Sequence, residues 1–321
     1  MRAVQLYGIG QLAVGTKAAP RLAPGQVRVQ VRAAGICGSD IHNYRTGKWL
    51  ATLPVTPGHE LFGEVLEAAA DVAGFAPGSR VVADSRVWCG QCEACQQDAH
   101  NLCASLGFVG EVCDGGFAEQ VVLPARSLLP VPEAVPDDVA VLSEPLGVAL
   151  RVLNQLRAPP GSRVRVAGGG TIGGLVALLL HRTGQCRVQL SEPNAERRAR
   201  LAALVPLEEA SPYDFAVEAT GQMAVLRELV AGIRPGGRIA LVGIFHHVAE
   251  LDCNLLVERE ITLTGCSVFR DEQRQALELM AGMAEDLRTL IAPPVPLEAV
   301  PAAYEALVAG RSSYLKTVVA P

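Results

Sequence analysis

Two different spacings of apolar residues divide this sequence. Residues 27–32 alternate apolar and polar side chains, and residues 60–68 and 79–83 are further apolar segments bounded by glycine and proline. A period of two predicts half-buried strands, and short strands with frequent turns predict a small barrel-like or sandwich-like unit. From 137 to 156 the apolar residues recur at helical spacing, and residues 158–161 (Ala-Pro-Pro-Gly) end that helix. We therefore place a domain junction at this point.

Beyond the junction, predicted strands and helices alternate. The strands are expected at 163–167, 186–190, 214–218 and 238–243, and the helices at 171–182, 194–204 and 223–233, the last closed by a Pro-Gly-Gly turn. This order predicts an α/β fold with a doubly wound parallel sheet. The segment 271–321 mixes helix with a final strand near 316–319, which has no evident partner in that sheet and is expected to return to the first domain.

Composition narrows the class of protein. A length of 321 residues suggests two domains, and the 32 glycines, half apolar content and 4% aromatic content are typical of a well-buried α/β protein. The net charge is −5 and no basic stripe is visible, which argues against nucleic acid and anionic membrane as partners. The longest strongly apolar stretch, 172–180, is too short to span a bilayer. No signal-like segment opens the sequence, so we expect a cytoplasmic protein.

Four cysteines lie close together in the first half: Cys89, Cys92, Cys95 and Cys103. A loop with this spacing can place four thiolates around one tetrahedral Zn²⁺, which gives a closed structural site. Disulfides are the disfavoured alternative, because nine cysteines are too few for a disulfide scaffold and the expected compartment is reducing. A zinc-ribbon interaction module remains open from this cluster alone.

A glycine loop opens the second half. The run Gly168-Gly169-Gly170-Thr171-Ile172-Gly173 fits G-x-G-x-x-G and lies between a predicted strand and a predicted helix, as a dinucleotide-binding turn requires. We expect Gly168, Gly170, Thr171, Ile172 and Gly173 to contact the cofactor diphosphate at the helix N-terminus. Glu192 ends the next strand, where a carboxylate can accept hydrogen bonds from the ribose and repel a 2′-phosphate. This favours NAD, although Arg197 and Arg198 nearby leave NADP open.

Two further fragments complete a pattern. They are Gly35-Ile36-Cys37-Gly38-Ser39-Asp40-Ile41-His42 and Pro57-Gly58-His59-Glu60. With the four-cysteine loop and the glycine loop, in this order, the chain resembles the zinc-dependent medium-chain dehydrogenase/reductase family along essentially its whole length. The resemblance implies a GroES-like β-rich catalytic domain (1–150 and 270–321) and a Rossmann domain (151–269). It also implies that the last strand returns to the catalytic domain.

The segment Ser143-Glu144-Pro145-Leu146-Gly147-Val148 is most similar to the polyol (sorbitol-like) dehydrogenases of this family. The resemblance implies a catalytic zinc on Cys37, His59 and Glu60, with Glu144 holding or replacing the bound water. With the four cysteines, this makes two zinc ions per chain. Val268-Phe269-Arg270 resembles the sorbitol dehydrogenase pattern, which implies that Arg270 lies near the substrate.

The implied activity is hydride transfer between NAD and a polyol or sugar-derived secondary alcohol, in a homodimer or homotetramer. Ser39 would accept the hydroxyl proton, His42 would deliver it to solvent, and Asp40 would orient a zinc ligand. L-threonine dehydrogenase shares these motifs and remains a second enzymatic hypothesis. A non-catalytic nucleotide-sensing zinc protein is the alternative of another class. Its only support is the short segment 200–213, where one edge strand or helix of the Rossmann sheet is predicted to be trimmed.

Overall fold

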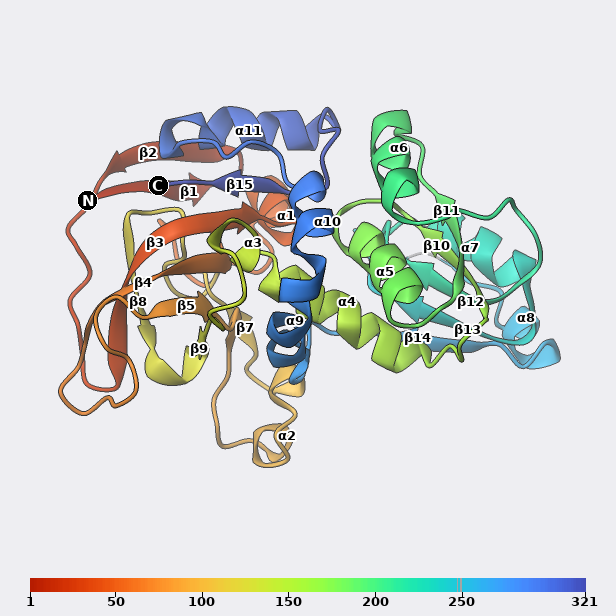
Figure 1. Cartoon of the computed structure of the whole chain (residues 1–321), viewed down its shortest axis with the longest axis horizontal. Helices are drawn as coiled ribbons and strands as arrows, with labels where there is room; N and C mark the ends of the chain where they lie inside the picture. The colour runs from red at the N-terminus through yellow and green to blue at the C-terminus, as the bar shows by residue number, and fades with distance from the viewer. Residues whose placement is uncertain (247, 249) are drawn as a thin grey trace. The chain divides into compact units, whose positions relative to one another are not determined.

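The computed structural model describes residues 1–321 except 247 and 249. His247 matches no motif in the sequence and is expected to be structural or exposed, but it lies outside the described residues. The chain forms two compact units. Unit 1 comprises residues 1–144, 273–312 and 316–321, and unit 2 comprises residues 145–272 and 313–315 (Figure 1). None of the helices in the described ranges is both long enough and apolar enough to cross a membrane.

Unit 1 is built on an antiparallel sheet with the strand order β15-β3-β4-β5-β9, in which β8 also pairs with β3. The strands of unit 1 are β1 (Arg2–Gly8), β2 (Gln11–Thr16), β3 (Gln26–Ile36), β4 (Glu60–Ala68), β5 (Arg80–Ala83), β6 (Arg86–Val87), β7 (Gly107–Phe108), β8 (Gln120–Pro124), β9 (Leu128–Pro130) and β15 (Thr317–Val319). Its helices are α1 (Gly38–Thr46), α2 (Glu93–Gln96), α3 (Asp137–Ala140), α9 (Glu272–Met280, whose first residue belongs to unit 2), α10 (Ala284–Leu290) and α11 (Val300–Val308). Short 3₁₀ turns cover His100–Leu102, Ala125–Ser127, Ala281–Met283 and Leu297–Ala299.

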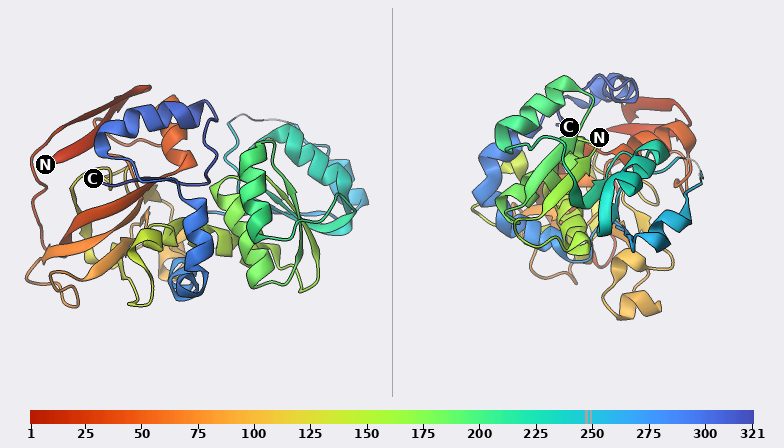
Figure 2. Two further views of the ribbon diagram at one scale, coloured as in Figure 1. Left: turned by 45° about the horizontal axis from the view of Figure 1, so that its top comes forward. Right: turned by 90° about the vertical axis from the view of Figure 1, so that its right-hand side faces the viewer.

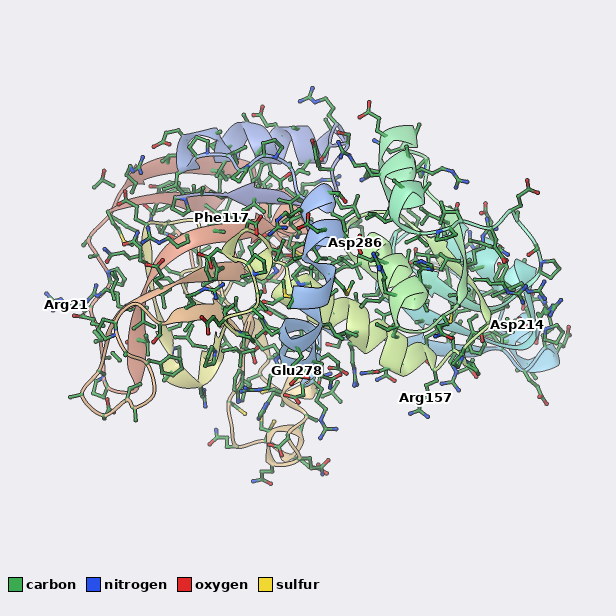
Figure 3. All side chains as sticks on the ribbon, in the orientation of Figure 1. Arg21, Phe117, Arg157, Asp214, Glu278 and Asp286 are labelled. Atoms are coloured by element: carbon green, nitrogen blue, oxygen red, sulfur yellow. The ribbon has the colours of Figure 1, made fainter. Side chains whose placement is uncertain are left out.

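The core of unit 1 follows from the alternation in β3. Val27, Val29 and Val31 are buried, whereas the residues between them are partly exposed. Phe117 is fully buried in the same core, and Figure 3 shows it inside this unit while Arg21 points outward. The period-two pattern therefore placed one face of this strand correctly.

Unit 2 contains a parallel sheet with the strand order β11-β10-β12-β13-β14. Its elements are α4 (Ser143–Leu156, whose first two residues belong to unit 1), β10 (Arg163–Ala167), α5 (Thr171–Arg182), β11 (Arg187–Ser191), α6 (Ala195–Leu204), β12 (Tyr213–Glu218), α7 (Met223–Gly232), β13 (Ile233–Leu241), α8 (Cys253–Glu258) and β14 (Thr262–Gly265).

Two of the strand–helix–strand crossovers of unit 2 run in opposite directions from the middle of the sheet. The chain passes from β10 through α5 to β11 on one side, and from β12 through α7 to β13 on the other. Since such crossovers are right-handed, opposite directions place α5 and α7 on opposite faces. Figure 2 shows helices on both sides of this sheet. The expected α/β fold class, with a β-rich first unit and a doubly wound parallel sheet in the second, is therefore confirmed.

Three further sequence predictions can be compared with the observed elements. The final strand β15 pairs antiparallel with β3, so it does return to the first unit. Near the shortened segment 200–213, the chain beside β11 forms a single parallel bridge between Leu207 and Val188. The predicted Pro-Gly-Gly turn after α7 lies inside a strand that begins earlier than expected. β13 begins at Ile233, but its register with β12 passes from Ile233 directly to Arg238, and Gly236 between them takes φ +75°, so the turn interrupts the pairing.

Candidate active site and metal centres

Strand pairing brings three predicted ligands together in unit 1. Cys37 follows the last residue of β3, Glu60 is the first residue of β4, and His59 directly precedes it. β3 and β4 are antiparallel neighbours with Gly35 opposite Glu60, so the end of one strand faces the beginning of the other. One donor atom from each of Cys37, His59 and Glu60 lies within 4.8 Å of the other two.

A tight turn before His59 sets this arrangement. Gly58 has φ +96°, and a Cβ atom there would lie 2.7 Å from the ring of Phe117, so a larger residue fits neither the backbone nor the space. The N–H of Gly115 donates to the carbonyl of Thr56 at 2.7 Å, and the N–H of Gly116 donates to that of Gly58 at 2.6 Å. The loop around Gly115 therefore clamps the turn that presents His59 and Glu60.

Glu60 is fully buried, and only one of its two carboxylate oxygens has a hydrogen-bond partner. Its Oε1 accepts a hydrogen bond from Lys316 Nζ at 2.6 Å, and the same ammonium donates to the carbonyl of Ile36 at 3.1 Å. Burial by itself would lower the pKa of Lys316, but the charge of Glu60 outweighs it and raises that pKa. Glu60 Oε2 is buried with no hydrogen-bond partner in the described chain. A Cβ atom at position 35 would lie 1.9 Å from this oxygen, so a larger residue there would displace the Glu60 carboxylate.

His59 lies in a strongly negative environment. Its Nδ1 is 3.7 Å from Asp40 Oδ1, and Asp40 Oδ2 accepts from the backbone N–H of Cys37 at 2.8 Å. Burial alone would lower the pKa of His59, but the charges of Asp40 and Cys37 outweigh it and raise the pKa well above its usual range. In the absence of a metal, this cluster therefore attracts a proton to its imidazole.

These residues fit a divalent metal. A thiol, an imidazole and a carboxylate are ligands that Zn²⁺ accepts, and three protein ligands leave a fourth position open. Glu60 Oε2 is buried without a hydrogen-bond partner, and a bound cation would supply the positive charge that this oxygen lacks. The contact between Asp40 and His59 resembles the carboxylate partners that orient metal-bound histidines.

Glu144 is buried and is close enough to His59 and Glu60 for their charges to act on it, but it is not part of the three-donor set. Its Oε1 accepts a hydrogen bond from Ser85 Oγ at 2.7 Å. Burial, followed by the charge of Glu60, raises the pKa of Glu144 to about 7, against the lowering effects of His59 and Ser85. The carboxyl group can therefore hold a substrate hydroxyl or a water molecule next to the three ligands instead of acting as a fourth ligand.

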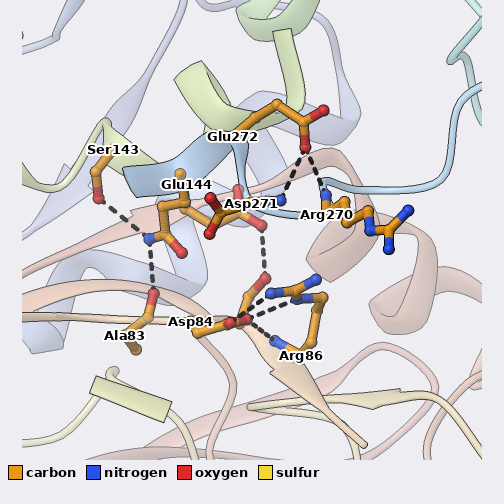
Figure 4. Close-up of polar contacts among 10 residues, drawn as sticks. Ala83, Asp84, Arg86, Ser143, Glu144, Arg270, Asp271 and Glu272 are labelled. Atoms are coloured by element: carbon orange, nitrogen blue, oxygen red, sulfur yellow. Dashed lines mark hydrogen bonds and ion pairs between the residues drawn. The ribbon is translucent and has the colours of Figure 1, made fainter. Parts of the chain in front are cut away.

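The remaining predicted site residues are less closely grouped. Ser39 is half-buried in the first turn of α1. His42 is buried on the same helix, with its ring centroid 4.3 Å from that of Trp49. Arg270 is an exposed residue of unit 2 whose backbone N–H donates to Glu272 at 2.6 Å (Figure 4). The proximity of Arg270 to the substrate stays a prediction.

Three polar residues near the site were missed by sequence reasoning. They are Lys316 and Ser85, described above, and the buried Glu111, whose Oε1 accepts from Asn43 Nδ2 at 2.8 Å. Burial raises the pKa of Glu111 to about 7, and the charge of Asp40 adds to this whereas that of His59 opposes it. A lysine within the apolar strand Leu-Lys-Thr-Val-Val was a usable signal, since a buried ammonium needs a partner. Nothing in the sequence marked Ser85 or Glu111.

The four-cysteine loop forms a second cluster in unit 1. One sulfur from each of Cys89, Cys92, Cys95 and Cys103 lies within 4.8 Å of the others, and all four are free thiols. Cys89 Sγ is 3.5 Å from Cys103 Sγ and 4.0 Å from Cys95 Sγ. Zn–S bonds of about 2.3 Å in a tetrahedron would space the sulfurs by about 3.8 Å. Hydrogen bonds from the Ala104 and Cys95 backbones lower the pKa of Cys92 to about 6, which favours the metal-binding thiolate.

The glycine loop lies in unit 2, between β10 and α5. Gly168 has φ +97°, and a Cβ atom on Gly173 would lie 1.8 Å from the carbonyl oxygen of Gly168. A Cβ on Gly170 would meet nothing within 4 Å, so its backbone is open to a ligand at the N-terminus of α5. Thr171 Oγ1 donates to the carbonyl of Leu315, and Ile172 is half-buried.

Glu192 directly follows β11 and is hydrogen-bonded to the glycine loop. Its Oε2 accepts from the N–H of Gly169 at 2.7 Å, and its Oε1 accepts from the N–H of Asn194 at 2.7 Å and from Arg197 Nη2 at 2.9 Å. The ion pair with Arg197 partly offsets the negative charge that a cofactor ribose would meet.

Comparison with known proteins adds to this geometry. The family model "Alcohol dehydrogenase GroES-like domain" matches residues 23–133, and "Zinc-binding dehydrogenase" matches residues 192–282. The chain is 26% identical to sorbitol dehydrogenase of Bacillus subtilis strain 168 over 100% of this chain and 97% of that protein. It is 32% identical to L-threonine 3-dehydrogenase of Pyrococcus furiosus over 77% and 76% of the two chains. The crystal structure of 2R,3R-butanediol dehydrogenase from Bacillus subtilis aligns with a TM-score of 0.90 and 28% identity, covering 100% of this chain and 99% of that one.

The chain therefore belongs to the zinc-dependent medium-chain dehydrogenase/reductase family, in its polyol dehydrogenase branch. It is an oxidoreductase that acts on CH–OH groups of small alcohols, and its relatives include both polyol and threonine dehydrogenases.

Proposed function

We propose that this protein oxidises a polyol or sugar-derived secondary alcohol with NAD, using a zinc ion held by Cys37, His59 and Glu60. The observation that carries the proposal is the three-donor cluster, whose Glu60 Oε2 is buried without a partner. A closed structural site would need no open position and no neighbouring acid such as Glu144.

A zinc ion bound there would polarise the substrate hydroxyl and lower its pKa. Cys37 and Glu60 supply two negative charges, and Lys316 offsets one of them through its 2.6 Å contact with Glu60. The Ser39 hydroxyl would accept the substrate proton while donating its own toward the ribose of a bound NAD, and the His42 imidazole would take up the proton released by that ribose and deliver it to solvent. Histidine suits this step because its ordinary pKa is close to neutral pH.

We also propose NAD as the cofactor. The N-terminus of α5 offers backbone N–H groups to a diphosphate, and Gly170 leaves room for its approach. The Glu192 carboxylate at the end of β11 accepts hydrogen bonds and repels a 2′-phosphate. Arg197 is paired with Glu192 at 2.9 Å, so its charge is not directed at the cofactor in this arrangement.

The test combines metal analysis with a substrate screen. We expect two zinc ions per chain and NAD reduction with polyols or aldonates that exceeds the rate with NADP. Cys37→Ser should abolish turnover and leave NAD binding unchanged, since the cofactor loop lies in unit 2. Full activity of Cys37→Ser would contradict the zinc assignment.

L-threonine is the second candidate substrate. The 32% identity to the Pyrococcus furiosus enzyme, above the 26% identity to sorbitol dehydrogenase, favours it in part. The threonine relative aligns over a smaller share of the chain, whereas the sorbitol and butanediol relatives align over all of it. Including threonine in the screen decides between these substrates.

A homodimer or homotetramer completes the proposal. β14 is the last strand of the sheet in unit 2, so its outer edge offers backbone groups for pairing with a second copy. The expected compartment is the cytoplasm, where the four thiols of the cysteine loop stay reduced. Light scattering of the purified protein measures the assembly directly.

A further inference from the structure

Ser85 occupies a position that neither the family pattern nor the sequence analysis identified. It lies between β5 and β6 in unit 1, is fully buried, and donates its hydroxyl to Glu144 Oε1 at 2.7 Å. This is the sole hydrogen bond to the Glu144 side chain in the part of the chain that the structure describes. One of the two carboxylate oxygens is therefore committed to a protein donor.

The backbone on both sides of Ser85 is fixed. The carbonyl of Ala83 accepts from Gln273 Nε2 at 2.9 Å, and the carbonyl of Ser85 itself accepts from the N–H of Val109 at 2.9 Å. Asp84 and Arg86 form a buried ion pair at 2.7 Å, and the Arg86 N–H donates to Asp84 Oδ1 at 3.1 Å. Because its neighbours are held in this way, the Ser85 hydroxyl is directed at Glu144 before any substrate arrives.

We propose that Ser85 is a positioning residue for the dehydrogenase reaction. By holding Oε1 it leaves the second oxygen of Glu144 as the one acceptor for the hydroxyl or water beside Cys37, His59 and Glu60. A freely rotating carboxylate could instead turn both oxygens toward the metal and compete with substrate for the open position. The inference rests on the proposed zinc site, to which Glu144 contributes.

Two serines allow a matched comparison. Ser143 precedes Glu144, is equally buried, and accepts from Gln273 Nε2 at 3.3 Å without touching the carboxylate. Ser143→Ala therefore removes a similar buried hydroxyl next to the same helix start. Ser85→Thr keeps the hydroxyl, whereas Ser85→Ala deletes it.

The experiment measures kcat, the KM for alcohol, the Kd for NAD and the zinc content of each holoenzyme. We expect Ser85→Ala to lower kcat by about 10- to 100-fold, the range for a lost hydrogen bond to a charged group. NAD affinity and zinc content should not change. Ser85→Thr should recover most of the lost rate, and Ser143→Ala should remain within about twofold of wild type, because no charged acceptor is lost.

Cobalt substitution supplies a readout that does not depend on turnover. With Co²⁺ in place of zinc, we expect Ser85→Ala to shift the visible ligand-field bands, and Ser143→Ala to leave them unchanged. Equal losses of kcat in the two alanine variants, or an unaltered cobalt spectrum in Ser85→Ala, would overturn the role of Ser85. If the wild-type enzyme oxidises none of the alcohols, the proposed function fails, and the cobalt spectra alone still decide whether Ser85 positions Glu144.

Discussion

The two metal clusters of unit 1 are built in opposite ways. The four cysteines come from one loop of the chain, residues 89–103, and their spacing alone brings the sulfurs together. Cys37, His59 and Glu60 come from the ends of two strands, and Lys316 joins them from the C-terminal strand region. A local cluster depends on loop sequence, whereas an assembled cluster depends on the pairing of β3, β4 and β15.

The clusters also differ in what they can do. Four sulfurs close a tetrahedral metal, whereas three mixed donors leave a position for substrate. His59 and Glu60 of the assembled cluster are buried, Cys37 is half-buried, and the charge of His59 acts on two further buried acids, Glu144 and Glu111, whose pKa values burial raises. Such perturbed groups are typical of catalytic sites. The cysteine loop has thiols and no comparable buried acid in its metal-binding set.

The largest expected effect separates the clusters by activity. Cys37→Ser should remove one zinc and lower kcat/KM by at least about 100-fold, since metal polarisation supplies several kcal/mol of transition-state stabilisation. Cys92→Ser should remove the other zinc and lower the melting temperature, because a closed zinc site contributes to folding. Zinc content, turnover and thermal unfolding measured on both variants check this. A catalytic loss in Cys92→Ser at temperatures where it is folded would break the comparison.

Much of this contrast could be predicted from the sequence. The cysteine spacing and the fragment around His59 each carry their information within a few residues. The parallel sheet and the return of β15 followed from the alternation of elements and from an unpartnered last strand. These features depend on local pattern and on general rules of sheet connection.

The partners of the site could not be predicted in the same way. Glu60 meets Lys316 across 256 positions in sequence, and Ser85 meets Glu144 across 59. No local pattern links such pairs, because only the folded sheet brings them within hydrogen-bonding distance.

The next expected effect tests the assembled cluster through its buried cation. Lys316→Met leaves the Glu60 carboxylate buried without its ammonium, and should cost about 3–5 kcal/mol in zinc-free protein. Lys17 forms an equally short ion pair with Asp114 at 2.6 Å, but that aspartate is 45% exposed. Lys17→Met should therefore cost less than about 1 kcal/mol.

Urea unfolding followed by tryptophan fluorescence measures both variants. The chain has two tryptophans, Trp49 and Trp88, and both lie in unit 1, so the signal reports the unit that holds the clusters. Equal losses of stability in the two lysine variants would mean that the buried Glu60–Lys316 pair contributes no more to the free energy of unfolding than the exposed pair does.

The next prediction concerns how the stability of the protein depends on pH through Glu111, a buried acid near the assembled cluster. The folded-state pKa of Glu111, about 7, lies above its ordinary value of 4.5, so the folded state binds the extra proton between these values. This favourable contribution is present below pH 4.5 and is lost as pH rises through 7. Glu111→Gln should therefore become more stable than wild type as pH increases from 5 to 8, by at most about 3 kcal/mol.

Glu119 supplies the control for this pH effect. Its hydrogen bond with Arg2 lowers the pKa of Glu119, so its contribution is already complete above pH 5. The stability difference between Glu119→Gln and wild type should stay constant between pH 5 and 8. If the Glu111→Gln difference is equally flat, the buried carboxyl does not titrate in this range.

The smallest expected effect concerns the carboxylate behind His59. Asp40→Asn keeps an oxygen that can accept from the Cys37 N–H but removes the charge 3.7 Å from His59 Nδ1. Loss of such an orienting carboxylate should weaken zinc binding at the assembled cluster by about 10-fold. Asp252 accepts a backbone N–H in the same way at the start of α8 in unit 2, so Asp252→Asn is the matched change without a metal nearby. Chelator competition should then release one zinc from Asp40→Asn earlier than from wild type and leave the cysteine-bound zinc unaffected. Release of both ions together would show that the two clusters are coupled, although one is built from a single loop and the other from paired strands.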